Sequence, residues 1–461
     1  MRRFIAFLIL LLIHSQLLSQ DRLNIELLAQ WKQDSLITNS SKVRYSDCYG
    51  FVWKDQEYAV IGSTEGTHVF LLSENNEFIP KGFIPGRYIS TTVSHRDYAT
   101  YQHYLYAVCD EGVSSLQIID FSHLPDSIQL IHEDSVQFGR VHNIFIDTNQ
   151  SLLYSLTHRS TVNTQTIEQP MKIFSLNDPL NLQEVWSGPS DVNEVHDAYV
   201  RNGMAFLNCG YDGLRVYDFS NLSNPLYLES LTFYQEQGYN HQGWLCPDGK
   251  TYLFADETNG KRIKKCTWNG TSLQINRYFG ENYENGSVPH NIMADDDFAY
   301  VAYYNEGFQI FDLRYPVPKR IAFFDTYPEE NFFQMNGNWG VYSLFPSGRI
   351  LASDRQYGLF ILKFDADSFR ETLIQDEALL YPNPAKTGEP FHVQFPFDAT
   401  EIEIEIRDLN DQLVLSSRME NASLYTTELE ISAGYYIAQI AFTDSFGTRR
   451  RENLTFVVIN P

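Results

Sequence analysis

Short runs in which hydrophobic and polar residues alternate recur along most of the chain, and Gly, Pro, Asn and Asp separate them. Clear examples are Leu116–Phe121, Leu214–Phe219 and Phe308–Leu313. Successive side chains of a β-strand point to opposite faces, so a period of two is typical of a strand with one face in a core. No extended stretch has the period of a helix. The pattern predicts an all-β fold class.

The predicted strands are arranged in a unit that occurs seven times. Each unit has a first strand, a polar turn, a second strand with Tyr or Phe, an acid–glycine turn and an alternating third strand, and most continue into a fourth. Successive units begin 47, 47, 54, 45, 49 and 48 residues apart. They start at Cys48, His95, His142, His196, His241, His290 and Asn338. This period is near that of propeller blades and too long for ankyrin or tetratricopeptide repeats.

Seven such units predict a seven-bladed β-propeller over residues 21–365, because neighbouring four-stranded blades cover each other's faces around a ring. The last unit ends at Phe364 without a clear fourth strand. The segment Asn24–Gln33 has the pattern of that missing strand. We therefore expect it to pair with Gly358–Phe364 and close the ring, which removes two open sheet edges.

The third strands, written LQIIDF, LRVYDF and FQIFDL, resemble LVIVD repeats. With the runs YAVIGSTEGTHVFLL and SHRDYATYQHYLYAVCDEGVSSLQIIDF, they make Leu23–Asp365 similar to the choice-of-anchor B proteins, a group of secreted LVIVD-repeat propellers. The first unit departs from that family at Ser46–Phe51, where an Asn/Asp-rich motif with tryptophan is expected. The resemblance implies a secreted propeller, and this family has no established enzymatic reaction.

A second strand pattern follows a polar linker at residues 366–376. Its strand runs predict a small Ig-like β-sandwich over residues 377–461. They are Glu401–Arg407, Gln412–Ser417, Tyr435–Phe442 and Leu454–Ile459.

Three motifs of this region, YPNPA, IRDLNDQLV and SAGYYIAQI, resemble the type IX secretion C-terminal sorting domain. Asp411 stands where that family usually has glycine. The resemblance implies export through the type IX secretion machinery, then release or attachment at the outer surface of a Gram-negative bacterium. An ordinary Ig-like adhesive domain is the alternative.

The first 20 residues, MRRFIAFLILLLIHSQLLSQ, have two arginines followed by an apolar run from Phe4 to Ile13. This run is too short for a stable bilayer span, so the segment is predicted to be a secretory signal peptide. No other run is long and apolar enough to cross a membrane. The mature chain is thus expected to lack a transmembrane span.

The chain of 461 residues has 34 basic and 58 acidic side chains, a net charge of −24. Such a surface repels phosphate backbones and anionic lipid, so nucleic acid is not an expected partner, whereas cations remain possible ligands. The five cysteines are few and odd in number for an exported protein. We expect buried single thiols rather than a disulfide framework.

Five histidines begin equivalent units, so a propeller would bring them to one end of its central channel. They are His95, His142, His196, His241 and His290. Imidazoles are common metal ligands, and they could bind a divalent cation with Asp47, Asp97, Asp197 or Asn338 nearby. The alternative is structural, with each histidine hydrogen-bonding to a neighbouring blade. A tetrahedral ion takes at most four ligands, so some must be structural in either case.

The leading functional hypothesis is a non-enzymatic module that binds a macromolecule or glycan through its loop face. The alternative is a hydrolase or lyase that uses a channel metal and its bound water. No GxSxG, HExxH, Walker or dinucleotide-binding motif occurs, and no cofactor beyond a divalent ion is suggested. The acid–glycine pairs are interpreted as hairpin turns. Glu194 and the pair Asp256-Glu257 could face the channel mouth, but nothing in the sequence pairs them into an acid–base couple.

Overall fold

A computed structural model describes residues 21–162, 165–280, 288–329, 335–370, 378–443 and 449–460. It divides the chain into two compact units. The propeller unit contains Met1–Leu313 and Val317–Ala366, and the C-terminal unit contains Arg314–Pro316 and Asp367–Pro461. The predicted signal peptide, residues 1–20, lies outside the described residues.

The propeller unit consists of seven antiparallel sheets, which confirms the predicted seven-bladed propeller. Blades 1 and 2 contain β3 (Tyr45–Trp53), β4 (Gln56–Ser63), β5 (Gly66–Leu72) and β6 (Phe78–Pro85), then β7 (Arg96–Tyr101), β8 (Tyr104–Cys109), β9 (Leu116–Asp120) and β10 (Gln129–Asp134). Blades 3 and 4 contain β11 (Asn143–Asp147), β12 (Leu152–Val162), β13 (Gln165–Ser175) and β14 (Gln183–Gly188), then β15 (Asp197–Arg201), β16 (Met204–Asn208), β17 (Leu214–Asp218) and β18 (Leu226–Leu231).

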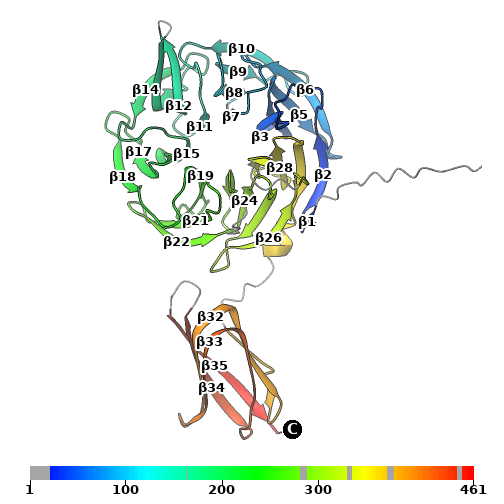
Figure 1. The fold of residues 1–461 in the computed structure, drawn as a ribbon, viewed down its shortest axis with the longest axis vertical. Helices are drawn as coiled ribbons and strands as arrows, with labels where there is room; N and C mark the ends of the chain where they lie inside the picture. Colours follow the sequence, from blue (N-terminus) through cyan, green and yellow to red (C-terminus); the bar gives the residue numbers. More distant parts are fainter. Residues whose placement is uncertain are drawn as a thin grey trace, which may run out of the picture. The chain divides into compact units, whose positions relative to one another are not determined.

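The remaining three blades complete the ring. Blade 5 contains β19 (Asn240–Leu245), β20 (Thr251–Asp256), β21 (Ile263–Trp268) and β22 (Leu273–Phe279). Blades 6 and 7 contain β23 (Ile292–Ala294), β24 (Phe298–Ala302), β25 (Phe308–Asp312) and β26 (Lys319–Phe324), then β27 (Asn338–Tyr342), β28 (Arg349–Asp354) and β29 (Gly358–Lys363). Figure 1 shows β7, β11, β15 and β19 toward the centre of the ring and β10, β14, β18 and β22 at its rim.

The ring is closed by the beginning of the chain, as the sequence predicts. Strand β2 (Glu26–Trp31) pairs antiparallel with β29 and completes blade 7. The structure adds a contact that was not predicted, because β1 (Arg22–Leu23) pairs with β26 as a fifth strand of blade 6. Two residues are too few to produce a recognisable alternation.

The hydrophobic core lies between neighbouring blades rather than within any one of them. One cluster joins Leu152 and Ile173 of blade 3 to Val200 and Leu207 of blade 4, and similar clusters join other neighbours. The aromatic residues predicted on the second strands are central to it. Tyr58, Tyr106, Tyr154 and Phe206 occupy the third position of their strands and are fully buried. Because no blade can bury both faces alone, the blades stabilise each other.

The C-terminal unit is a β domain with a core of its own, as predicted. It includes most of the short helix α1 (Ala366–Arg370) and a six-stranded sheet. Five strands of this sheet have the order β30-β32-β34-β35-β31, and β33 pairs with β32. Its strands are β30 (Leu379–Tyr381), β31 (Ala385–Lys386), β32 (Pro390–Asp408), β33 (Leu413–Glu428), β34 (Gly434–Thr443) and β35 (Arg449–Ile459).

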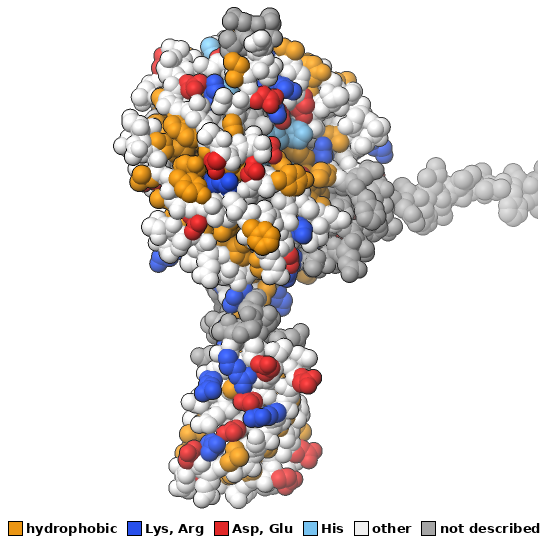
Figure 2. Space-filling model, turned by 60° about the vertical axis from the view of Figure 1, so that its left-hand side comes forward, with side chains coloured by type: hydrophobic (Ala, Val, Ile, Leu, Met, Phe, Trp, Pro, Cys, Tyr) orange, Lys and Arg blue, Asp and Glu red, His pale blue; other side chains and the backbone are white. Residues whose placement is uncertain are grey.

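Alternation along β32 explains how the C-terminal core forms. Ile402, Ile404 and Ile406 are buried, while the glutamates between them point outward. On the face of this unit seen in Figure 2, basic and acidic side chains lie side by side. Ion pairs such as Arg418–Glu403, at 3.1 Å, join charged residues of its strands. Asp411 adopts a left-handed conformation with φ of 64°, so the turn survives without the glycine that the family usually has there.

One smaller expectation also holds. All five cysteines are buried and free, so they act as small hydrophobic residues. Within the described ranges, no helix combines the length and hydrophobicity needed to cross a bilayer.

Candidate functional site

The structure brings the five repeat histidines together on the propeller axis, where Trp339 completes a closed ring of six side chains. We call this set the histidine ring. Neighbouring ring centroids are 5.2 Å apart for His95–His142, 4.2 Å for His142–His196, 4.3 Å for His196–His241, 4.3 Å for His241–His290, 4.2 Å for His290–Trp339 and 5.1 Å for Trp339–His95.

Trp339, not Asn338, stands at the ring position of blade 7. Asn338 occupies the position in blade 7 that Asn240 occupies in blade 5. Each forms an isolated β-bridge to the preceding blade and directly precedes the ring residue. The Asn338 side chain donates to the carbonyl oxygens of Gly340 and Ser353, at 3.2 and 2.8 Å. The amide nitrogen of Asn338 is therefore engaged by the backbone of its own blade, and the aromatic residue beside it contacts the imidazoles.

Hydrogen bonds at Nδ1 fix the orientation of several imidazoles. His196 donates to the backbone oxygen of His241 at 3.2 Å, and His290 donates to that of Trp339 at 2.7 Å. A carbonyl oxygen only accepts, so in both rings Nδ1 carries the proton and Nε2 of the neutral ring is the acceptor. These two contacts join neighbouring blades, as the structural hypothesis for the histidines requires.

The other side of the ring pairs with carboxylates from turns. His95 Nδ1 lies 2.5 Å from Glu111 Oε1, and His142 Nδ1 lies 2.9 Å from Asp110 Oδ2. Burial alone would lower the pKa of His142, but the Asp110 carboxylate outweighs it and the pKa is raised. In contrast, burial lowers the pKa of His241 to about 4 and those of His196 and His290 well below the usual value.

A second set of side chains, which we call the polar layer, crosses the channel next to the ring. Its members are Asp47, Asp97, Asn143, Asp197, Gln242 and Asn291. They connect blades, since Asn143 Nδ2 donates to Asp197 Oδ2 at 2.7 Å and Asn291 Nδ2 donates to Asp47 Oδ2 at 2.9 Å. The three aspartates that the sequence places near the histidines thus belong to this neighbouring layer.

Gly340 gives Asp47 its place in the polar layer. A Cβ atom at position 340 would lie 1.9 Å from Asp47 Oδ1. Blade 7 therefore contributes a space rather than a side chain, and the carboxyl group of blade 1 fills it.

The carboxyl groups of the polar layer favour the protonated form. Burial raises the pKa of Asp47 to about 7 and that of Asp197 to about 8. Burial, followed by the nearby Asp47, raises the pKa of Asp97 well above the usual range. Since a protonated carboxyl group both donates and accepts, the layer presents hydrogen-bonding groups with little charge.

The polar layer is the floor of an axial cavity of about 290 Å³. Aromatic side chains line its walls, among them Tyr49, Phe145, Tyr199, Trp244 and Tyr342. A smaller cavity of about 20 Å³ lies between the polar layer and the histidine ring. That volume is enough for one water molecule or ion. The channel thus has an aromatic end and an imidazole end.

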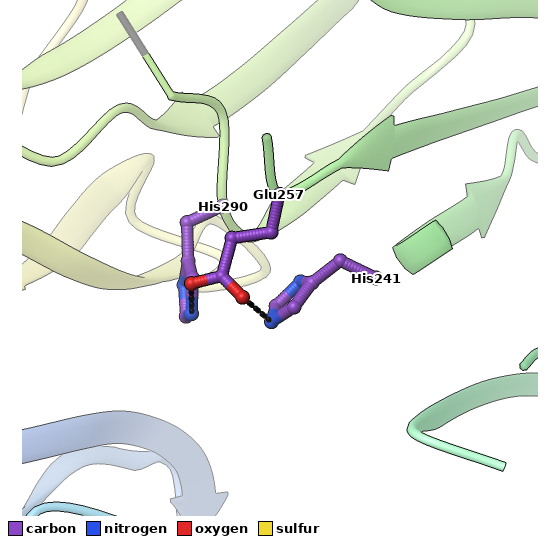
Figure 3. A group of neighbouring side chains, drawn as sticks. All are labelled: His241, Glu257 and His290. Carbon is purple, nitrogen blue, oxygen red and sulfur yellow. Dashed lines mark ion pairs between the residues drawn. The ribbon is translucent and has the colours of Figure 1, made fainter. Parts of the chain in front are cut away.

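At the imidazole end, Glu257 lies between two members of the histidine ring (Figure 3). Its Oε2 is 3.8 Å from His241 Nε2, and its Oε1 is 3.9 Å from His290 Nε2. The hydroxyl of Tyr304 donates to Oε1. The sequence indicates that Glu257 could face the channel but offers it no partner, and the structure supplies two. The roles of Asp110 and Glu111 were missed because their positions signal only a turn.

The C-terminal unit can be compared with known families. Residues 379–450 match the secretion system C-terminal sorting domain. This match includes the YPNPA, IRDLNDQLV and SAGYYIAQI motifs and confirms the resemblance to the type IX sorting domain. The protein is therefore exported by type IX secretion and interacts with that machinery. No curated protein matches the chain.

Proposed function

We propose that the propeller is an extracellular binding module and not an enzyme. The proposed division is a signal peptide at residues 1–20, the propeller at 21–365, a linker at 366–376 and the sorting domain at 377–461. The sorting-domain match supports export, and the LVIVD-like third strands support membership of the choice-of-anchor B group. The proposed destination is the outer surface of a Gram-negative bacterium or the surrounding medium.

The axial cavity carries the proposal about the ligand. Its volume of about 290 Å³ is at the lower end for small-molecule sites, which suits the end of a glycan chain. Ring faces such as those of Tyr199 and Trp244 pack against the apolar faces of a sugar. The protonated carboxyl and amide groups of the polar layer hydrogen-bond to hydroxyls, and their low charge disfavours a cationic ligand.

Glycan-array screening of the mature protein, followed by calorimetry with the best ligand, tests this proposal. Trp244→Ala should weaken binding about 10-fold through the loss of one stacking surface. Phe233→Ala is the matched control, because Phe233 is 91% exposed and lies outside the cavity lining. Absence of glycan binding, or equal affinity in both variants, would refute the cavity as the site.

A metal-dependent hydrolase or lyase is the second candidate function. One observation favours it, namely the convergence of His241 and His290 with a carboxylate in the channel. The other residues proposed to line the channel are His95, His142, His196 and Asn338. Metal-dependent turnover in a substrate panel, abolished in His241→Ala, would make this the preferred function.

A further inference from the structure

We propose that His241, Glu257 and His290 form a binding site for one divalent transition-metal ion. Their candidate ligand atoms all lie within 4.8 Å of one another. The two nitrogen–oxygen separations, 3.8 and 3.9 Å, are too long for hydrogen bonds. Ligands at a tetrahedral zinc with bonds of 2.0–2.1 Å are separated by about 3.4 Å. A shift of about 0.5 Å would therefore bring each of these two nitrogen–oxygen separations to the tetrahedral value.

The hydrogen bonding of the His290 ring gives a second, independent indication of a bound ion. Its Nδ1 donates to the Trp339 backbone oxygen, so Nε2 carries a lone pair in the neutral ring. The residue is only 2% exposed, and Nε2 has no hydrogen-bond partner. In Figure 3 this nitrogen points at an oxygen of Glu257. A buried lone pair opposite a carboxylate is unfavourable, and a cation between them removes the conflict.

Hydrogen bonds hold two of the three ligands, His290 and Glu257, in place. Tyr304, which is fully buried, donates its hydroxyl to Glu257 Oε1. The Glu257 backbone nitrogen donates to the Tyr239 oxygen at 2.8 Å. Such outer contacts orient ligands and typically change metal affinity by about 10- to 100-fold. Glu257 and His290 are therefore held by the scaffold before any ion binds.

The donor set also selects the class of metal. Two imidazole nitrogens and one carboxylate suit Zn²⁺ and related first-row ions, whereas Ca²⁺ and Mg²⁺ prefer oxygen ligands. Among the described residues, this is the one group of at least three His, Cys, Asp or Glu ligands in such an arrangement. His95 and His142 lie outside it because Glu111 and Asp110 already engage them. Three protein ligands leave a coordination position for water or another ligand.

Zinc titration of the chelator-treated mature protein by calorimetry, with metal analysis after dialysis, tests the site. The wild type should bind one Zn²⁺ per chain with micromolar or tighter affinity. Glu257→Gln keeps the size of the side chain and should lower affinity at least about 100-fold, and Tyr304→Phe should lower it about 10-fold. His290→Ala removes a ligand and should abolish zinc binding. Circular dichroism checks that this variant is folded.

His95→Ala is the matched control, because it removes a member of the histidine ring that lies outside the proposed ligand set. It should keep the stoichiometry of one. No Zn²⁺ bound to the wild type, unchanged affinity in Glu257→Gln, or equal losses in His95→Ala and His290→Ala would overturn the site. The test is independent of the proposed glycan site, since Trp244→Ala should leave zinc affinity unchanged.

Discussion

The polar layer and the histidine ring lie side by side in one channel. The carboxyl groups of the polar layer and those that pair with the ring have pKa values shifted in opposite directions. In the polar layer, burial raises the pKa values of Asp47 and Asp197. At the ring, burial works in the same direction, but His142 and Arg159 outweigh it and lower the pKa of Asp110. The difference shows that the cationic partner, and not burial alone, decides the charge of a carboxyl group here.

Among the variants that test this comparison, Asp197→Asn should have the largest effect on the free energy of unfolding. In the folded protein the Asp197 carboxyl has a pKa of about 8, whereas in the unfolded chain its pKa is about 4. Wild-type stability therefore falls as pH rises through this window. The variant lacks this loss, so its free energy of unfolding relative to wild type should improve by up to about 4 kcal/mol from pH 5 to pH 8.

Urea unfolding of both proteins at several pH values measures this effect. Groups that do not interact with position 197 cancel in the difference between the two proteins. His142 does interact with Asp197, so its own titration is followed by NMR in both proteins. A difference that stays constant from pH 5 to pH 8 would show that Asp197 is ionised in the folded protein.

Gly340→Ala disrupts the polar layer by steric conflict. The new methyl group would lie against Asp47 Oδ1, and overpacking of this kind costs about 3 kcal/mol of unfolding free energy. Ligand binding in the axial cavity should weaken, whereas zinc binding at the other end should not. Gly434→Ala is the control, because its nearest contact would be an ordinary 3.6 Å. Equal stability of the two variants would contradict the packing argument.

Asp110→Asn tests the ring side and should give the smallest of these effects. Asp110 accepts from Arg159 Nη1 and His142 Nδ1, at 2.5 and 2.9 Å, and losing this charge should cost about 2 kcal/mol at pH 7. The sign is opposite to that of Asp197, since a lowered pKa stabilises above the unfolded value of about 4 and this stabilisation disappears in acid. The difference in unfolding free energy between Asp110→Asn and the wild type should therefore vanish at low pH.

The pKa of His142 gives a second measurement for the same variant. Without the Asp110 carboxylate, burial is no longer outweighed, so the pKa of His142 should fall. Titration of the imidazole protons by NMR checks this. An unchanged value would mean that Asp110 is not the group that holds the charge on His142.

The sequence was sufficient to predict the blades, their number and the closing strand, because each depends on a local alternation that recurs. It also brought out the five histidines, since repetition places them at equivalent points. Trp339 was missed because the ring residue of blade 7 is a tryptophan, so the repeated histidine gives no guide to it. Asn338 is equivalent to Asn240, and the same register shift surrounds the ring residue in blades 5 and 7. Glu257 follows the strand after His241, and no pattern encodes how a side chain from that turn folds back over the axis.

The charge of the polar layer could not be predicted from the sequence either. Asp97 and Asp110 are the same residue type, yet opposite shifts separate their pKa values. What differs is the neighbour across the blade boundary. Asp97 accepts from the neutral backbone nitrogen of Ile144, whereas Asp110 accepts from the Arg159 cation. Such neighbours are far apart in the sequence, so only the packed ring defines them.

The pairing of β2 with β29 has a consequence for how the propeller assembles. Residues near 26 and near 363 must meet before the last blade exists, so this contact has one of the largest sequence separations in the molecule. Contacts of this kind form slowly, because a long chain must be brought together first. Until they form, β26 and β29 remain unpaired edges, and the incomplete wheel is the state most exposed to aggregation on its way out of the cell.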